Sequence, residues 1–553
     1  MPESILPSPI PATFVSSWKT QGWWWRCASL LIAGLVAIPI LILFPAWLIP
    51  EGGVWHHLAD TVLLELLRNT VVLMVGVGIG VFVIGVGLAW LTVMCEFPGR
   101  RVFEWALMLP LGIPTYVLAF VAIGLLDFSG PVQGMLREIF GARGYWFPHI
   151  RSECGVIGVM VLALYPYVYM LARSAFLSHG RNMLESGRIL GLSPWAAFLR
   201  VSLPMARPAI AAGVSLALME TLADFGAVYI FNYDTFTTAI YKAWFGLFNI
   251  NAAAQLATLL LVFVALALYG ERRWRGAARF YNQGKAARDH RYQLKGKGAW
   301  FAILAASVVL ALGFLIPVTQ LLFWAVRSGL ESLDARYMEF VTHTLILGAL
   351  AALLTVSTAF LLVYVRKLWP DKLTRFAMRL ATLGYAMPGT VLAVGIMLFL
   401  TRIDNGIDAV AQSWFGISTG LLLSGTLIAL LFAYLVRFLA VAHGPVDSAL
   451  EGIKPSIQQA ARSLGASHRE ILWRVYLPML RPGLLTAALL VLVDVMKEMP
   501  ATLLLRPFDW DTLAIHIFEL TSEGQWHQAA LPALSLVMVG LLPVILLVRQ
   551  SRN

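Results

Sequence analysis

The sequence predicts an all-α integral membrane protein with about twelve transmembrane helices in two parallel six-helix repeats. Three observations lead to this fold class. Hydrophobic residues make up 59% of the 553 residues and charged residues only 13%, with a mean hydropathy of +0.77. About twelve stretches are long and apolar enough to cross a bilayer, and the chain matches itself at an offset of 274 residues. Such a composition is typical of membrane proteins, so the length of the chain indicates the number of membrane-spanning helices and not the number of soluble domains.

About twelve apolar stretches are long enough to cross a membrane, because a bilayer core needs about 20 apolar residues to be spanned by a helix. The first stretch follows Lys19 and Arg26, but it is too long for a signal peptide and lacks a small-residue cleavage site before Pro39, so we read it as a retained span. The predicted spans are 27–49, 66–94, 106–126, 154–176, 207–229, 251–270, 300–326, 341–365, 377–401, 418–441, 480–503 and 530–548.

Basic residues lie between the spans and set the orientation. The formal net charge is +11, and the segment 271–299 holds nine Lys and Arg residues against Glu271 and Asp289. The positive-inside rule places this segment in the cytosol, and twelve crossings then place both termini there as well. The charge is divided among loops, which argues against nucleic-acid binding. Other basic residues expected on the cytosolic side are Arg100, Arg101, Arg366, Lys367, Lys372, Arg375, Arg549 and Arg552.

The internal match makes the chain a tandem repeat. At the offset of 274, Pro114 falls on Pro388 and the segment 203–208 falls on 477–482, with small insertions needed around the fourth and tenth spans. Each repeat carries six spans, so both enter the membrane in the same orientation, related by a pseudo-two-fold axis along the membrane normal. The predicted organisation is a first half at 1–270, a basic cytosolic linker at 271–299 and a second half at 300–553.

A structured cytosolic loop precedes the fifth span of each half. Gly191 and Gly465 suit the left-handed position that closes a helix. Ser193 before Pro194 reads as an N-cap followed by proline at the first helical position. In the second copy, Ser467 and Glu470 have the spacing of a capping box. Each loop is therefore predicted to consist of two short helices with a break between them.

These loops resemble the EAA loop of ABC importer permeases of the binding-protein-dependent type. The resemblance implies the type I ABC importer permease fold, and a short helix that inserts into a groove of an ATP-binding subunit. Ser186 and Gly187 stand where the family has alanines, and Gln459 replaces the glutamate, so the two ATPase contacts can differ. The implied coupling residues are Glu185, Ser186, Gly187, Gly191, Leu203 and Pro204 in loop 185–204, and Gln459, Ala460, Ala461, Gly465, Leu477 and Pro478 in loop 459–478.

The chain shows no catalytic site of its own. It contains no G-x-x-x-x-G-K-[ST] phosphate loop, so ATP and Mg are expected on a partner ATPase dimer, with no cofactor bound by this chain. The cysteines, Cys27, Cys95 and Cys154, lack metal-ligand spacing. A secondary transporter is an alternative, although it would not need two EAA loops. A membrane enzyme is a weaker one, because the histidines and cysteines form no recognisable catalytic set.

Four acidic residues lie inside predicted spans, two in each half and at matching positions. Each pair has i, i+4 spacing and so lies on one helix face. A charged side chain at such depth costs about 2.5 to 3.5 kcal/mol and usually faces a cavity or a partner. We expect them to line the substrate pathway, and the alternative is structural pairing with Lys497 or Arg506. The four residues are Glu220, Asp224, Asp494 and Glu498.

Hard oxygen ligands suit a hard cation such as Fe(III), and the surrounding sequence is similar to the ferric iron permeases. The similar segments are 220–226, 234–241, 497–502, 505–508 and 511–513. The resemblance implies transport of Fe(III) across the bacterial inner membrane, with no metal ligand firmly assigned. It also implies a periplasmic ferric-binding protein that docks on the outer loops, which include 229–250 and 504–529. Thiamine, sulfate, polyamines and phosphonates remain the alternative substrates of the same architecture.

Overall fold

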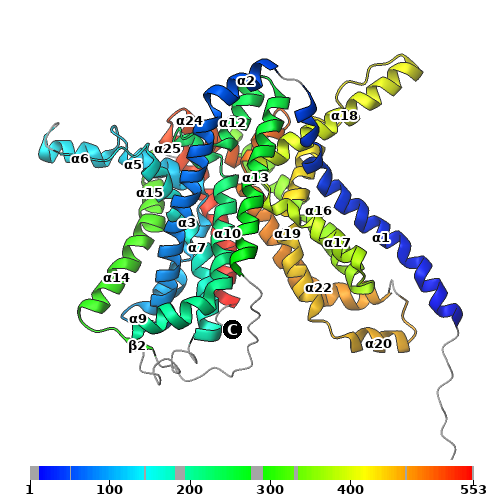
Figure 1. The fold of residues 1–553 in the computed structure, drawn as a ribbon, viewed down its shortest axis with the longest axis horizontal. Coiled ribbons are helices and arrows are strands. Elements are labelled where there is room, and N and C mark those ends of the chain that lie inside the picture. Colours follow the sequence, from blue (N-terminus) through cyan, green and yellow to red (C-terminus); the bar gives the residue numbers. More distant parts are fainter. Residues whose placement is uncertain are drawn as a thin grey trace, which may run out of the picture. The chain divides into compact units, whose positions relative to one another are not determined.

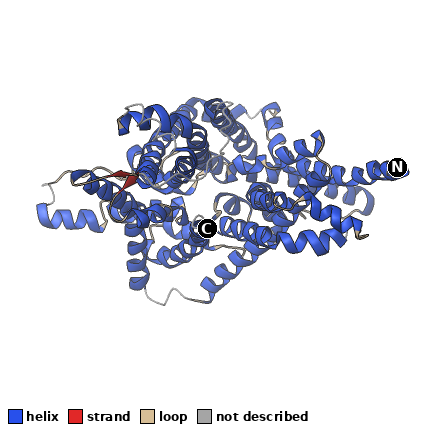
Figure 2. Cartoon of the chain, turned by 90° about the horizontal axis from the view of Figure 1, so that it is seen from below, coloured by secondary structure: helices blue, strands red, loops and turns tan. Residues whose placement is uncertain are grey.

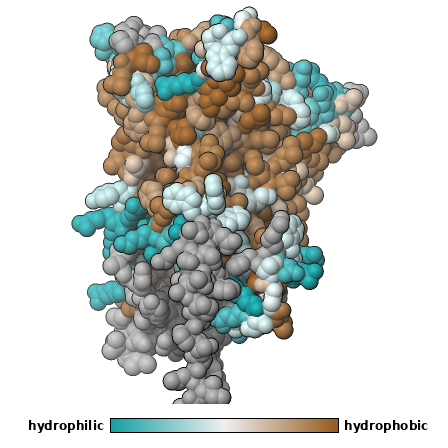
Figure 3. Space-filling view, turned by 90° about the vertical axis from the view of Figure 1, so that its right-hand side faces the viewer, coloured by the Kyte–Doolittle hydropathy of each residue, from teal (hydrophilic) through white to brown (hydrophobic). Residues whose placement is uncertain are grey.

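The computed structural model confirms a helical chain with twelve candidate membrane spans among the residues it describes. Figure 3 shows hydrophobic side chains gathered in one broad band with hydrophilic side chains at its edges, as expected of a surface that faces lipid. The described residues are 12–49, 52–141, 145–180, 193–275, 291–328, 334–467 and 470–550.

The first half of the chain contributes six spans connected by short helices (Figure 1). Its long helices are α1 (Ala12–Leu41), α3 (Leu63–Met94), α5 (Thr115–Leu126), α7 (Glu153–Ala175), α10 (Leu203–Ala223) and α13 (Ile250–Arg275). Its shorter elements are η1 (Phe44–Leu48), α2 (Gly52–Thr61), β1 (Cys95–Glu96), α4 (Arg100–Ala106), η2 (Leu109–Gly112), α6 (Pro131–Phe140), η3 (Phe176–Gly180), α9 (Pro194–Ala197), η4 (Phe198–Ser202), α11 (Gly226–Ile230), α12 (Phe236–Tyr241) and η5 (Lys242–Gly246).

The second half repeats this plan with six further spans. Its long helices are α14 (Lys297–Leu310), α15 (Ile316–Ser328), α16 (Ala335–Leu368), α18 (Gly389–Phe415), α19 (Leu427–Glu451), α22 (Leu477–Lys497) and α25 (Trp526–Gln550). Its shorter elements are β2 (Tyr292–Gln293), η6 (Ala311–Leu315), α17 (Lys372–Ala381), η8 (Leu383–Ala386), α20 (Pro455–Ser463), η9 (Ile471–Tyr476), α23 (Pro500–Leu505) and α24 (Leu513–Ser522).

The third and ninth spans begin later than the hydropathy predicts, at Thr115 and Gly389. The residues just before them, Pro114 and Pro388, have extended backbones with ψ of 145° and 139°. Proline cannot donate a backbone hydrogen bond, so it separates the preceding 3-10 turn from the new helix. The tenth span also starts late, at Leu427, because glycines with positive φ occupy the segment before it.

The fifth and eleventh spans are interrupted near their C-terminal ends, where the sequence predicts continuous helices over 207–229 and 480–503. The helix α10 ends at Ala223 and α22 ends at Lys497, and each is followed by a short separate helix, α11 or α23. The hydropathy continues across both breaks, so the apolar pattern alone conceals them. The breaks place Asp224 and Glu498 at the starts of the short helices.

The chain folds as two compact units whose boundaries differ from those of the sequence halves. The first unit comprises Met1–Leu41, Ala349–Tyr385 and Tyr434–Leu492, and the second comprises the remaining segments, Ile42–Gly348, Ala386–Ala433 and Val493–Asn553. In the first unit, α1 packs against α17 of the second half, and Arg26 Nε lies 2.9 Å from an Asp371 carboxylate oxygen. The N-terminal helix therefore belongs structurally with part of the second half.

In the second unit, conversely, the first span of the second half packs against helices of the first half. A Cβ atom at Gly313 would stand 3.3 Å from Pro110 and 3.4 Å from the carbonyl oxygen of Leu162. The ring of Phe120 in α5 stacks on Trp324 of α15 and on Trp526 of α25, with centroids 6.3 and 6.2 Å apart. Segments of the two repeats thus share one core within this unit.

A two-stranded parallel ladder fixes the described end of the linker to the first half. Cys95 in β1 pairs with Tyr292 in β2, and these are the strands drawn in red in Figure 2. Arg291 Nη1 lies 3.0 Å from Glu96 Oε2, and the buried Arg100 pairs with the same carboxylate at 3.1 Å. The Ala302 side chain of α14 joins the small apolar core beside Cys95. The linker therefore ends in an ordered contact just before the second half begins.

Candidate substrate pathway and coupling loops

Asp224 caps the short helix α11 at the break in the fifth span. Its Oδ1 accepts hydrogen bonds from the backbone N–H groups of Ala227 and Val228 at 3.0 and 3.2 Å. Its Oδ2 accepts a hydrogen bond from the Thr115 hydroxyl at 2.5 Å. The Thr237 hydroxyl donates to the backbone carbonyl of Asp224 at 2.7 Å. The carboxylate thus satisfies the free N–H groups at the start of a helix, which also favours negative charge.

Glu498 does the same at the break in the eleventh span. It is 5% exposed, and its two carboxylate oxygens accept from the backbone N–H groups of Ala501 and Thr502, both at 3.0 Å. The Thr502 hydroxyl donates a third hydrogen bond at 2.8 Å. Asp224 and Glu498 therefore have backbone amides and hydroxyls as partners. Arg506, named above as a possible partner, instead pairs with Asp511 and with Glu519.

The other two intramembrane carboxylates, Glu220 and Asp494, lie in the same compact unit as Lys497. Both interact electrostatically with the ammonium group of Lys497, and all three side chains are partly buried. Lys497 Nζ also donates to the backbone carbonyl of Leu111 at 3.3 Å. A Cβ atom at Gly540 would stand 2.6 Å from Lys497 Cε and 2.7 Å from Nζ, so only glycine leaves room for this lysine. Lys497, named above as a possible structural partner, thus lies within electrostatic range of Glu220 and Asp494.

The four carboxylates therefore divide into two pairs, each related by the repeat. Asp224 and Glu498 close helix ends, whereas Glu220 and Asp494 lie within α10 and α22 and interact electrostatically with Lys497. Among the described residues, no group of three or more His, Cys, Asp or Glu side chains is arranged to hold a metal ion. The sequence analysis named Lys497 only as a possible partner. Its position three residues after Asp494 on an apolar helix was the available signal.

An aromatic cluster lies directly beyond the capped carboxylate of Asp224. The buried ring of Phe225 contacts Tyr229, Tyr241 and Phe518, with centroids 5.3, 5.2 and 5.6 Å apart. Phe518 comes from α24 of the second half and the others from the first half, all in the same compact unit. The cluster therefore packs outer segments of both repeats against each other.

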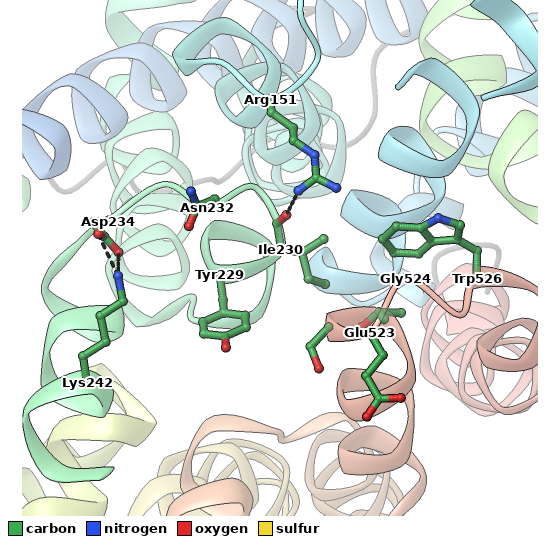
Figure 4. A pocket seen from close by; sticks show the side chains of 11 residues that line it. Arg151, Tyr229, Ile230, Asn232, Asp234, Lys242, Glu523, Gly524 and Trp526 are labelled. Carbon is green, nitrogen blue, oxygen red and sulfur yellow. Dashed lines mark hydrogen bonds and ion pairs between the residues drawn. The ribbon is translucent and has the colours of Figure 1, made fainter. Parts of the chain in front are cut away.

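A polar pocket of about 580 Å³ lies beside this cluster, and Tyr229 belongs to both. Figure 4 shows Asp234 and Lys242 paired at one side of the pocket, with Glu523 and Trp526 at another. Lys242 Nζ lies 2.7 Å from Asp234 Oδ1. These residues lie in or beside the predicted outer loops 229–250 and 504–529. Segments of both repeats thus form one cavity.

The first predicted coupling loop, 185–204, is described only in part. Glu185, Ser186, Gly187 and Gly191 lie outside the described residues. The Ser193 hydroxyl accepts a hydrogen bond from the backbone N–H of Ala196 at 3.3 Å, which confirms the predicted N-cap. Leu203 and Pro204 open α10, so this loop runs directly into the span that ends at the Asp224 break.

The second predicted coupling loop, 459–478, is described except for residues 468 and 469. Its first helix, α20, is followed by the predicted break, whereas η9 continues directly into α22 and is not a separate short helix. Gly465 has a φ of 82°, as predicted for a left-handed helix-closing position. Ser467 and Glu470 form the predicted capping box, with reciprocal hydrogen bonds of 3.0 and 3.3 Å. The Ser467 backbone N–H lowers the pKa of the Glu470 carboxyl below its usual value, so the cap is ionised at neutral pH.

The helix α20 carries Gln459, Ala460 and Ala461, and its first two motif residues are exposed. Leu477 and Pro478 begin α22. The sequence analysis missed a link between these two elements. The buried Tyr476 donates a hydrogen bond from its hydroxyl to Gln458 Oε1 at 2.9 Å, which ties α20 to the start of α22.

Several permease proteins are similar to this chain. The Fe(3+)-transport system permease protein of Haemophilus influenzae is 32% identical over 495 residues, covering 88% of this chain and 90% of that protein. The ferric transport system permease protein of Actinobacillus pleuropneumoniae is 23% identical over 539 residues, covering 92% and 74%. The molybdate/tungstate transport system permease protein of Thermococcus kodakarensis is 25% identical over 240 residues, covering 43% of this chain and 89% of the relative.

A family model places these similarities in both halves of the chain. The model, described as the inner membrane component of binding-protein-dependent transport systems, matches residues 81–271 and 346–551. Each match includes one coupling loop and one interrupted span. This chain therefore belongs to the inner membrane components of binding-protein-dependent transport systems, with two copies of the family domain fused in one polypeptide.

Proposed function

We propose that this chain is the transmembrane permease of an ATP-driven importer that moves ferric iron into the cytosol. The observation that carries the proposal is its 32% identity to an Fe(3+)-transport permease over 88% of its length, in both halves. The intramembrane carboxylates support the same substrate class, because oxygen donors suit a hard cation. The proposal includes an inner-membrane topology with both termini in the cytosol.

The proposed partners follow from the family and from the loops. An ATPase dimer holding ATP and Mg would dock at the cytosolic loops 185–204 and 459–478. The exposed motif residues on α20 and the capped turn after it support this placement. An ordered helix can transmit a movement of the ATPase to the span, which a flexible loop cannot do. On the outer side, a periplasmic ferric-binding protein would dock over loops 229–250 and 504–529, where the polar pocket opens.

The proposed substrate pathway passes the four carboxylates. Glu220 and Asp494 would meet a passing cation together with Asp224 and Glu498, because the two acidic residues of each half are spaced i, i+4. Asp224 and Glu498 hold the first turns of α11 and α23 beside the aromatic cluster. Asp224 and Glu498 thus stand at the two helix breaks, and Glu220 and Asp494 lie four residues before them, within α10 and α22.

A second substrate class comes from the molybdate/tungstate relative, which is similar to one half of this chain. An oxyanion would be favoured by cationic groups, and the outer pocket does contain Arg151 and Lys242. Both are neutralised, since Arg151 pairs with Asp127 at 3.2 Å and Lys242 pairs with Asp234. The carboxylates deeper in the unit then favour a cation.

The test is uptake of radiolabelled Fe(III) into vesicles that contain this chain, its ATPase and its binding protein, with thiamine and molybdate as comparison substrates. We expect iron uptake that stops when ATP is omitted. ATP-dependent uptake of thiamine or molybdate in place of iron would keep the importer and overturn the substrate. Uptake driven by a proton gradient without ATP would favour a secondary transporter.

A further inference from the structure

Two arms of the second compact unit expose apolar side chains at the ends of the third and ninth spans. The first arm is 128–140 and includes α6; the second arm is 402–423 and includes the end of α18 and the chain that returns beside it. At the offset of 274, residues 131–140 fall on 405–414, so the arms occupy the same place in the two repeats. We propose that both arms lie in the membrane–water interface, with their apolar side chains inserted among the lipids.

The first arm turns its polar side inward. Gln133 Nε2 donates a hydrogen bond to the carbonyl of Leu126, the last residue of α5, at 2.9 Å. One turn later, Arg137 Nη1 donates to the carbonyl of Phe128 at 2.7 Å, and its guanidinium carbon lies 4.4 Å from the centroid of the Phe128 ring. These contacts hold the polar side of α6 against the chain that leaves α5.

The opposite side of α6 is apolar and exposed. An α-helix turns about 100° per residue, so Met135 and Ile139, each two residues after one of the inward-facing side chains, lie about 200° around the helix from them. Their side chains are 63% and 64% exposed. Figure 1 shows α6 projecting sideways from the long helices of its unit. A helix in water buries its apolar side, so the exposed side of α6 requires an apolar partner.

The second arm has the same arrangement, built from different side chains. The buried Asp404 accepts hydrogen bonds from the backbone N–H groups of Leu423 and Ser424 at 3.0 and 2.8 Å. One turn later, Asp408 accepts from the backbone N–H of Thr419 at 2.6 Å. The two carboxylates thus bind the returning chain to the polar side of α18.

Apolar side chains cover the other side of the second arm. Val410 lies two residues after Asp408, about 200° around the helix, and Trp414 lies one turn further on. They are 52% and 78% exposed, and Phe415 and Leu421 beside them are exposed as well. Both arms therefore use their polar groups inside the protein and present apolar groups outside it.

The place of the arms in the chain identifies the apolar partner as the bilayer. From their starts to Leu126 and Thr401, α5 and α18 carry no charged side chain, and the next residues are Asp127 and Arg402. Charged residues are costly in the hydrocarbon core, so both spans reach its boundary at these two positions. The arms begin at this boundary and continue the lipid-facing surface into the interface, where amphipathic helices lie and tryptophan is enriched.

The charges of the arms indicate how they would bind the bilayer. The first arm contains one basic and one acidic residue and the second contains one basic and two acidic residues, so neither is net positive. Attraction to anionic lipid headgroups therefore contributes little, and burial of apolar surface drives insertion. The proposal thus predicts insertion into a bilayer of zwitterionic lipid alone.

The anchored helices are those that contact the two interrupted spans. Thr115, the first residue of α5, donates a hydrogen bond to Asp224 at 2.5 Å, and α18 packs against α23. Insertion of the arms therefore holds at the membrane surface the two helices that pack beside the breaks.

The test is electron paramagnetic resonance of spin labels on the full chain in phosphatidylcholine nanodiscs, with the three native cysteines replaced by alanine. Labels at Ile139→Cys and Trp414→Cys report on the apolar sides of the arms. The matched controls are Glu138→Cys and Gln412→Cys, exposed neighbours nearer to the polar sides. We expect the ratio of accessibility to oxygen over accessibility to a water-soluble nickel chelate to be at least about threefold higher at the apolar positions, because oxygen concentrates in lipid. Addition of phosphatidylglycerol should leave this difference unchanged.

The other possible occupants give different results. Equal ratios at the apolar and control positions would overturn the proposal. Labels that are accessible to the nickel chelate in the nanodisc and become protected when a binding protein is added would assign the arms to that protein instead. Protection that appears only when two copies share one nanodisc would assign them to a second copy, and this also overturns the proposal.

Met135→Cys and Val410→Cys provide a second pair of labels on the same apolar sides, and thermal unfolding shows which labelled variants are folded. The measurement requires no transported substrate. Its outcome is therefore independent of whether the chain imports iron, and failure of the proposed function leaves this inference standing.

Discussion

Asp224 and Glu498 hold the same position in the two repeats and make the same kind of hydrogen bonds. Each places a carboxylate at the start of a short helix, and each accepts from two backbone N–H groups. The side chains differ in length, yet both reach the same donors, so the shared feature is the helix cap. Capping explains why an acidic residue is suited to both positions even without a cation.

Capping gives the first prediction. Asp224→Asn keeps an oxygen that can accept from Ala227 and Val228, whereas Asp224→Ala removes the cap. We expect the alanine variant to lose about 1 to 2 kcal/mol of unfolding free energy and the asparagine variant only a few tenths. Thermal unfolding in detergent measures both. Equal destabilisation by the two substitutions would contradict the capping role.

Iron uptake by the same two variants separates structure from transport. If the charge of Asp224 is needed in the pathway, Asp224→Asn stays folded and loses uptake. If Asp224 only caps α11, Asp224→Asn transports like the wild type.

Gly540 leads to the second prediction. A Cβ atom there would stand 2.2 Å from the carbonyl oxygen of Gly112 and 2.6 Å from Lys497 Cε. Gly540→Ala must therefore displace backbone or lysine, at a cost of about 1 to 3 kcal/mol. The matched control is Gly158→Ala in α7, where an added Cβ would meet nothing within 4 Å. Thermal unfolding should separate them, and equal unfolding temperatures would contradict the close packing around Lys497.

At the scale of elements, local signals in the sequence predicted the second coupling loop well. Gly465, Ser467 and Glu470 each act within four residues, so their conformations follow from local rules. The breaks after α10 and α22 were missed for the opposite reason. Hydropathy stays high across them, and the capping residues look like pathway carboxylates until the backbone is seen. The spacing from Asp224 to Ala227 and the proline at 500 were the local signals for these caps.

The third prediction concerns the link between α20 and α22. Tyr476→Phe removes the hydroxyl that donates to Gln458 and keeps the buried ring. The first repeat has Ser202 and Leu184 at the corresponding positions, so the link belongs to the second loop, whose motif glutamine replaces the glutamate. We expect the variant to lose about 0.5 to 1.5 kcal/mol of stability, and to transport fewer iron ions per ATP hydrolysed.

The control for this variant is Tyr364→Phe, which changes the neighbouring tyrosine whose ring packs 5.8 Å from that of Tyr476. Uptake and ATP hydrolysis are measured together in vesicles. An unchanged ratio of iron to ATP in Tyr476→Phe would show that the hydrogen bond stabilises the loop without positioning it for coupling.

At the scale of the whole molecule, the sequence predicted the number of spans and the repeat, because both depend on composition and register. It did not predict which helices pack together. Hydropathy shows that α1 and α14 cross the membrane, but their partners depend on surface shape, such as the close approach at Gly313. The same limit applies to Lys497, whose close approach to Gly540 and to the Leu111 carbonyl depends on the packing of separate helices.

The exchange of first helices gives the last prediction, which concerns assembly of the halves. Phe120 of the first half is fully buried against Trp324 and Trp526 of the second half, and Ala302 packs beside Cys95. A half expressed alone exposes these apolar surfaces and lacks the helix that covers them. Fragments 1–285 and 286–553 should therefore be unstable alone and co-purify when co-expressed, because membrane helices associate through such close packing. Detergent extraction followed by size-exclusion chromatography measures this, and a stable monodisperse fragment 1–285 on its own would show that the first half completes its core without the exchanged helices.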